Sequence, residues 1–293
     1  MKLYAPKYYK QFNCIADKCK HSCCIGWEID IDSETLGKYN SLSAEASESI
    51  LNSIDFCNSP HFKLLDNKRC QNLDENGLCT IIKSMGEDYL CDICREHPRF
   101  YNFTNRGKEV GIGMSCEEAC RIILSSDDYD EMIEIAEVPG EEDISDFDAI
   151  TRINIFYNFL KDEEFNIIGK MAILYDTYDI VVEFEHMLET LEELEYLNPE
   201  NRAAFLSYAE LDDVVPNDNE LTRAFAYFIY RYCSEACNYV EFCESLSFAA
   251  FCTKLILGIT SIDDIYEKAR IVSEEIEYSE QNIEIIKSRL FYY

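Results

Sequence analysis

The sequence predicts a mostly α-helical protein in which an irregular, cysteine-rich metal-binding module packs on an all-α helical bundle. Three observations predict this arrangement: the clustering of cysteine, a change from short broken segments to long amphipathic ones, and an uneven distribution of charge. They divide the 293 residues into a cysteine-rich module at 1–125 and an acidic helical bundle at 140–293. The boundary is expected within EVPGEED at 137–143.

Cysteine is concentrated in the first part of the chain. Eleven of the 15 cysteines lie between Cys14 and Cys120, none lies in 121–232, and four lie between Cys233 and Cys252. The opening residues lack the apolar core of a secretory signal, and no run of about 18 apolar residues occurs, so we expect a cytoplasmic protein without membrane insertion. In a reducing cytoplasm, clustered cysteines point to metal or redox chemistry rather than to disulfides.

The first 120 residues contain short segments separated by turn-forming pieces such as LDENG and NRGKEVGIG. WEIDID at 27–32 alternates between apolar and polar residues as a short strand does, and Ser33 is expected to cap the helix that follows. Because regular elements are scarce here, metal ligation is expected to organise this part of the fold.

Long amphipathic helices are expected after about residue 140. The clearest apolar stripe, set between acidic residues, consists of Phe184, Met187, Leu188, Leu191, Leu194 and Leu197. Similar patterns predict helices in 145–160, 218–238, 240–257 and 262–290. Asn198-Pro199 and Val215-Pro216 are expected to interrupt the helices, because the residue before a proline avoids helical geometry.

Negative charge is concentrated in the second part of the chain. Residues 1–120 carry 14 Lys and Arg against 18 Asp and Glu, whereas 121–293 carry 12 against 39. Such a surface repels phosphate backbones and anionic lipid, which disfavours nucleic-acid and membrane-surface roles. The ordinary interpretation of this negative charge is a solvated face that keeps the helices soluble. The functional interpretation is that the charge attracts a cationic substrate such as a lysine side chain.

The cysteines of the first part have the spacing of metal ligands. Their groups are Cys14, Cys19, Cys23 and Cys24 in C-x4-C-x3-CC, Cys70 and Cys79, Cys91 and Cys94 in C-x2-C, and Cys116 and Cys120. Thiolates select zinc or iron–sulfur centres over hard cations. Zinc would suit two C-x2-C pairs and only one is present, so an iron–sulfur cluster is favoured, with zinc or metal-free thiols as alternatives. The four cysteines after residue 232 are interpreted as small core residues.

These motifs resemble the flagellin lysine-N-methylase family, which is related to a wider group of CC-motif domains that chelate zinc or iron. The resemblance rests on FNCIADKCKHSCCIGWEIDID, LDENGLCTI, GEDYLCDICREHPRFYNF and GMSCEEACRIIL, which follow one another in the expected order within residues 4–125, and on RAFAYFIYRYC at 223–233. Two departures, Glu117 in place of a proline and Cys120 in place of a small residue, indicate a divergent member.

The resemblance implies a cytoplasmic enzyme that transfers a methyl group from S-adenosylmethionine to lysine Nε atoms of flagellin, with a four-iron cluster held by cysteines. Carried over to this sequence, the family motif gives as the best metal ligands Cys19, Cys23, Cys24, Cys70, Cys79, Cys91 and Cys94. Cys14 and Cys116 come next in order. The alternative to this function is an iron–sulfur or zinc-binding redox or structural module without methyltransferase activity.

Methyl transfer to lysine requires a neutral amine, which tyrosine and carboxylate side chains are suited to produce. Tyr227, Tyr230 and Arg231 share one predicted helix and are the candidate catalytic residues, with an ordinary structural role as the alternative. No glycine-rich fingerprint follows a predicted strand, so the sequence assigns no residue to S-adenosylmethionine and places any such site outside the Rossmann-like frame.

Overall fold

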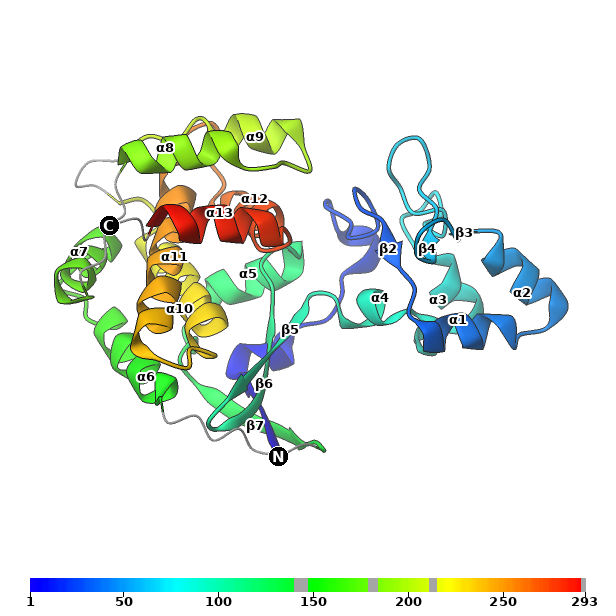
Figure 1. The fold of residues 1–293 in the computed structure, drawn as a ribbon, viewed down its shortest axis with the longest axis horizontal. Helices are drawn as coiled ribbons and strands as arrows, with labels where there is room; N and C mark the ends of the chain where they lie inside the picture. The colour runs from blue at the N-terminus through cyan, green and yellow to red at the C-terminus, as the bar shows by residue number, and fades with distance from the viewer. Residues whose placement is uncertain (140–146, 179–183, 211–214, 291–293) are drawn as a thin grey trace. The chain divides into compact units, whose positions relative to one another are not determined.

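A computed structural model describes residues 1–139, 147–178, 184–210 and 215–290 (Figure 1). Thirteen α-helices and seven short β-strands occur in these ranges, which confirms the prediction of a mostly α protein.

The chain forms two compact units. The cysteine-rich unit is Asn13–Arg99, and the helical unit combines Met1–Phe12 with Phe100–Tyr293. The units therefore divide the chain at two places, after Phe12 and after Arg99, which differ from the single boundary expected at 137–143. Most of that expected boundary, from residue 140 onward, lies outside the described residues.

The cysteine-rich unit is built from short elements around a small core. Its helices and strands are α1 (Ser33–Asn40), α2 (Ala44–Leu51), α3 (Thr80–Met85), α4 (Asp92–Glu96), β2 (Ile29–Asp30), β3 (Ile54–Asp55) and β4 (His61–Phe62). The strands form an antiparallel sheet in the order β2-β4-β3. Tyr39 and Phe62 are the large side chains buried in its core.

The start of α1 corrects one prediction. The strand expected at 27–32 is present as the two-residue β2, but Ser33 does not cap the helix. Asp32 is the capping residue, and its Oδ1 accepts a hydrogen bond from the Thr35 amide at 2.8 Å. A carboxylate at this position also interacts favourably with the positive end of the helix dipole, which a serine hydroxyl does not.

A four-stranded sheet, which the sequence did not predict, belongs to the helical unit. Its strands, in the spatial order β5-β6-β1-β7, are β5 (Arg99–Thr104), β6 (Gly107–Ile112), β1 (Lys2–Pro6) and β7 (Met132–Glu137). Strand β1 runs parallel to β6 and antiparallel to β7. The stretch NRGKEVGIG, expected to be a turn, contains all of β6, and Gly107 there has a φ of 140° and would place a Cβ atom 2.7 Å from the Lys2 carbonyl oxygen. Only glycine fits this backbone.

Nine helices complete the described part of the helical unit. They are α5 (Glu117–Ser125), α6 (Ala149–Leu160), α7 (Ile167–Tyr178), α8 (Phe184–Glu193), α9 (Pro199–Phe205), α10 (Asp218–Cys233), α11 (Tyr239–Gly258), α12 (Ile265–Ile276) and α13 (Glu280–Leu290). Helices α10 and α11 lie side by side at the centre, and α5, α6, α12 and α13 pack against them (Figure 1). Helix α11 is buried on every face from Phe242 to Leu257 apart from two half-buried positions, because its sequence is apolar almost all round.

The helix predictions were largely confirmed, with two corrections. The helix expected at 262–290 is two helices, α12 and α13, because the Ser279 hydroxyl accepts a hydrogen bond from the Asn282 amide at 3.1 Å and starts a new helix. Asn198-Pro199, expected to interrupt helical structure, starts α9: the Asn198 side chain accepts from the Glu200 amide at 2.9 Å, and Pro199 occupies the first turn. The first residues of the helix expected at 145–160 lie outside the described ranges.

Among the helices of the described ranges, none combines the length and the apolar composition that crossing a bilayer requires.

Candidate functional sites

Five of the seven predicted ligand cysteines gather at the core of the cysteine-rich unit. Cys70 and Cys91 are buried in that core, and Cys24, Cys79 and Cys94 pack against it. They reach it from four different segments of the chain, so the structure brings together groups that the sequence separates. We call these five residues the thiol cluster.

The thiols of this cluster affect one another's ionisation. The Cys91 and Cys94 side chains share a hydrogen bond, which lowers the pKa of Cys91 and raises that of Cys94. A hydrogen bond from Cys23, together with the nearby Arg69 guanidinium, lowers the pKa of Cys24 to about 7 despite its burial. Burial, with a smaller contribution from the nearby Cys24, raises the pKa of Cys70 to about 11. A cation among these sulfurs would remove their mutual repulsion and release their protons.

The donor chemistry of the thiol cluster fits a soft metal centre, since all five groups are sulfur. Within the ranges that the structure describes, no three or more His, Cys, Asp or Glu side chains are arranged to hold a metal ion. The thiol cluster therefore offers donors of suitable chemistry, but the described residues do not form a metal-binding shell.

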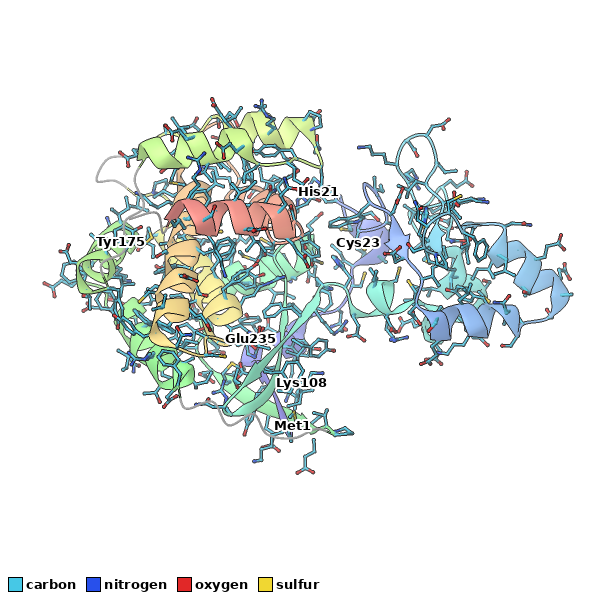
Figure 2. All side chains as sticks on the ribbon, viewed as in Figure 1. Met1, His21, Cys23, Lys108, Tyr175 and Glu235 are labelled. Atoms are coloured by element: carbon cyan, nitrogen blue, oxygen red, sulfur yellow. The ribbon has the colours of Figure 1, made fainter. Side chains whose placement is uncertain are left out.

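The remaining predicted ligands lie in the loop before β2. Cys19 donates a hydrogen bond to the His21 carbonyl oxygen at 3.3 Å, and Cys23 is exposed (Figure 2). The second-choice ligand Cys116 occupies the position just before α5 and belongs to the helical unit.

The cysteines after residue 232 were interpreted as small core residues. Cys233, Cys243 and Cys252 are buried, as predicted, and burial raises the pKa of each thiol. Cys237 differs, because it is exposed just after α10 ends.

Asp32 positions the Cys91–Cys94 segment. Cys91 occupies the N-cap position of α4 without a side-chain capping bond, and Asp32 caps this helix instead: its Oδ2 accepts a hydrogen bond from the Asp92 amide at 2.9 Å while Oδ1 accepts from the Thr35 amide. One carboxylate thus binds the first turns of both α1 and α4. Burial alone would raise the pKa of Asp32, but the hydrogen bonds from Asp92 and Thr35 outweigh it and lower the pKa to about 2.

We expect Asp32→Ala to destabilise the cysteine-rich unit by about 1–2 kcal/mol, because two helix starts lose their cap. A carboxylate with a lowered folded-state pKa stabilises the fold above its unfolded pKa, near ~4, and that contribution is lost as the pH falls towards 2. Urea unfolding at pH 7 and at pH 3 should therefore show a larger difference between variant and wild type at pH 7. Exposed Asp66, changed to alanine, is the matched control. An equal loss at both pH values would contradict the assignment.

The three predicted catalytic residues all lie on α10, and two of them form one network. Arg231 Nη1 donates to the Tyr227 hydroxyl at 2.8 Å, and that hydroxyl donates to Glu277 Oε2 at 2.9 Å. Arg231 Nε lies 3.3 Å from Glu277 Oε1, and the guanidinium lies 4.5 Å from the centre of the Phe100 ring. Burial opposes the charge of Arg231, but Glu277 and nearby tyrosines raise the pKa of Arg231 well above its ordinary value. Tyr227 therefore holds Arg231 and Glu277 in place.

A second buried carboxylate, that of Glu109, interacts electrostatically with Tyr230. Glu109 is fully buried, and its Oε1 accepts hydrogen bonds from Arg106 Nε at 3.0 Å and from Thr104 Oγ1 at 3.2 Å. Burial raises the pKa of Glu109 and also that of Tyr230. Within the part of the chain that the structure describes, neither Glu109 Oε2 nor the Tyr230 hydroxyl has a hydrogen-bond partner.

A cavity of about 390 Å³ opens between β5, the end of α10, α11 and α13. Its lining is aromatic and charged, and includes Phe100, Tyr101, Arg231, Glu235, Glu244 and Lys287. Every lining residue belongs to the helical unit. Figure 2 labels Glu235, whose Oε1 accepts a hydrogen bond from the Phe103 amide of β5 at 2.9 Å. Of the three predicted catalytic residues, Arg231 lines this cavity, and Tyr227 accepts a hydrogen bond from the Arg231 guanidinium.

The sequence did not single out Glu277, Glu244 or Lys287. Glu244 lies on the next helix, and Glu277 and Lys287 follow more than 40 residues after α10, so only packing brings the three to the site. One signal was available for Lys287: it is one of 12 basic residues among 173 in the acidic part of the chain, where an unexplained cation is unusual.

Fold and sites together define a class: a mostly α protein that carries a cluster of thiols and a separate charged, aromatic cavity. No protein-family model matches the chain, and no solved structure is similar to it.

Curated relatives connect this class to a family. The chain is 27% identical over 132 residues to the lysine-N-methylase of Salmonella choleraesuis, an alignment covering 42% of this chain and 32% of that protein. The lysine-N-methylase of Salmonella typhimurium gives 27% over 134 residues, with 42% and 32% covered. The flagellar biosynthetic protein FliU of Salmonella muenchen gives 27% over 134 residues, with 42% of this chain and 77% of FliU covered.

These similarities confirm the resemblance predicted from the sequence: the chain is related to the flagellin lysine-N-methylase family. The aligned part spans about one third of the length of the two lysine-N-methylases.

Proposed function

We propose that this chain is a cytoplasmic protein-lysine N-methyltransferase that acts on flagellin and takes its methyl group from S-adenosylmethionine. The observation that carries the proposal is the similarity to proteins named lysine-N-methylase and FliU. The net charge of −31 supports it, because an acidic surface attracts lysine-bearing segments and repels nucleic acid.

The reaction requires a neutral amine, and lysine has an ordinary pKa of about 10.4. The nitrogen lone pair attacks the methyl carbon, the carbon–sulfur bond breaks with its electron pair passing to sulfur, and the product is a protonated methylamine. Carboxylates that line the cavity, Glu235 and Glu244, are suited to accept the proton that the amine must lose before attack.

The proposal includes a four-iron cluster held by the thiol cluster, with Cys19 and Cys23 completing the ligand pool. Such a centre would be held by these thiols and would supply a rigid anchor for the cysteine-rich unit. The chain's own contribution is the placement of the thiols, which depends on Asp32 and on the packing around Tyr39.

The test combines anaerobically purified full-length chain with flagellin and S-adenosylmethionine and follows intact flagellin by mass spectrometry. We expect a mass increase of one methyl group, which peptide mapping assigns to lysines. Flagellin with acetylated lysine amines is the control substrate, since its amines cannot react. No change in mass over a complete time course would overturn the proposal.

The second candidate is an iron–sulfur or zinc-binding redox or structural module without methyl transfer. The thiol cluster favours it, because five cysteines around one small core are soft donors of the kind that zinc and iron–sulfur centres use, whatever the helical unit does. A visible absorption change on reduction, without methylation of flagellin, would select this function.

A further inference from the structure

One lysine of the helical unit lies on aromatic rings instead of beside a carboxylate. The Lys108 Nζ atom, on β6, lies 4.2 Å from the centre of the Tyr101 ring and 5.4 Å from that of the Phe103 ring. Both rings belong to β5, where Tyr101 is 38% and Phe103 52% exposed. Lys108 forms no ion pair with any described residue, although the chain carries 57 acidic residues. The amine is therefore presented at the surface on an aromatic support.

Two other lysines of the same region are held by carboxylates. The Nζ atom of Lys2 lies 2.8 Å from Glu134 Oε2. That of Lys7 lies 2.9 Å from Glu131 Oε2. In each pair an acceptor oxygen occupies the approach to the nitrogen. The rings instead cover one side of Lys108 Nζ, and among the described residues no acceptor is bonded to its other side.

The strand that supports Lys108 also forms one wall of the cavity. Tyr101 lines that wall, and the Phe103 amide donates a hydrogen bond to Glu235, another lining residue, at 2.9 Å. Lys108 and Glu235 are both labelled in Figure 2. Glu235 and Glu244 are the cavity carboxylates that the proposed reaction uses as proton acceptors. Lys108 is thus a lysine amine beside the groups that methyl transfer requires.

The rings suit the product of methylation as well as the amine. A methylated lysine keeps its positive charge and gains an apolar surface, and aromatic faces bind such ammonium groups. The Lys108 ammonium first gives a proton to a cavity carboxylate or to water. Its neutral nitrogen then attacks the methyl carbon of the sulfonium donor, and the carbon–sulfur bond breaks with its electron pair passing to sulfur. The product is a protonated methyl-lysine on the same two rings.

We propose that Lys108 is a self-methylation site, at which the chain transfers a methyl group to its own Lys108 Nζ atom. The inference rests on the proposed function for the activity and for the methyl donor. It adds a second substrate, which is the protein itself, and the position that is modified.

The test incubates the anaerobically purified full chain with S-adenosylmethionine in the absence of flagellin. Intact mass and peptide mapping should show one added methyl group, on Lys108. Lys108→Arg keeps the charge and a group that can lie on the rings, but removes the amine, so this methylation should be lost while flagellin is still methylated. Lys10→Arg makes the same change at an exposed position of the helical unit, and should leave methylation of Lys108 as in the wild type.

A second variant tests the aromatic support without removing the amine. Phe103→Leu should slow methylation of Lys108 about two- to fivefold, because one ring contact of an exposed cation is lost. Phe103 does not line the cavity, so flagellin should be methylated at the wild-type rate. Phe56→Leu is the matched control, because Phe56 is exposed in the cysteine-rich unit and should leave both rates unchanged.

The outcomes separate this inference from the proposed function. Methylated flagellin without a methyl group on Lys108 overturns the inference and leaves the function standing. A methyl group on Lys287 instead, whose Nζ lies 5.8 and 6.0 Å from two other rings, also overturns it. Methylated Lys108 with unmodified flagellin supports the inference and overturns flagellin as the substrate. If neither protein gains mass, the inference and the proposed function both fail.

Discussion

Replacement of Arg231 by methionine is expected to destabilise the helical unit by about 3–5 kcal/mol. The side chain of Glu277 is fully buried, and Arg231 is its cationic partner at 3.3 Å with only 14% of its own side chain exposed. Methionine fills much of the same volume but leaves the Glu277 carboxylate buried without a counter-charge. Tyr227 can still donate one hydrogen bond to that carboxylate, which lessens the loss without removing it.

Urea unfolding followed by far-ultraviolet circular dichroism measures this loss. Arg289→Met is the matched control: Arg289 contacts Glu189 and Glu193 at the surface with 39% of its side chain exposed, and its loss should cost less than about 1 kcal/mol. Adding Glu277→Gln to Arg231→Met should recover part of the stability, because the uncompensated charge is then removed. If Arg231→Met proved no more destabilising than Arg289→Met while methylation was abolished, Arg231 would be a catalytic residue rather than a structural one.

The sequence predicted the helices of the second part better than the strands of the first, for a physical reason. Helices α10 and α11 could be predicted locally, because each is a long, largely apolar stretch without proline and the length of a helix. The four-stranded sheet is not local: β1 pairs with β6 across more than a hundred residues, and β6 contains two of the chain's ten glycines and two charged residues. The sequence of β6 therefore has no clear alternation of apolar and polar residues and predicts a turn.

The two candidate sites differ in the same way. The cysteines of the C-x2-C and CC motifs can be recognised as candidate metal ligands from the sequence, because cysteine is rare and these spacings are typical of metal ligands. The cavity has no such motif, because glutamate and lysine are common on any helix and become a site only when α10, α11 and α13 pack together. Arg231 could be singled out from the aromatic stretch around it, but its partner Glu277 could not, because the two residues meet only in the folded chain.

Replacement of Cys91 by serine is expected to abolish the iron and sulfide content of protein purified without air. Wild-type chain should contain about four iron and four sulfide per molecule if the thiol cluster holds the proposed centre. Cys91 is fully buried and shares a hydrogen bond with Cys94, so its sulfur cannot be replaced from solvent. Serine fits the same space, but its hydroxyl is a harder and far more weakly acidic donor than a thiol, and the neighbouring thiols are left without a shared cation.

Cys57→Ser is the control within the same unit, because Cys57 is exposed and outside the predicted ligand pool, and Cys237→Ser is the control in the helical unit. Both should keep iron and sulfide at the wild-type level. Measuring zinc in the same samples decides between the metals, since zinc without sulfide in the wild type would select the zinc-bound alternative. Cys91→Ser protein that kept its full iron and sulfide would show that the cluster is held by other residues, because removing one of four thiolates from a single cluster cannot leave the centre unchanged.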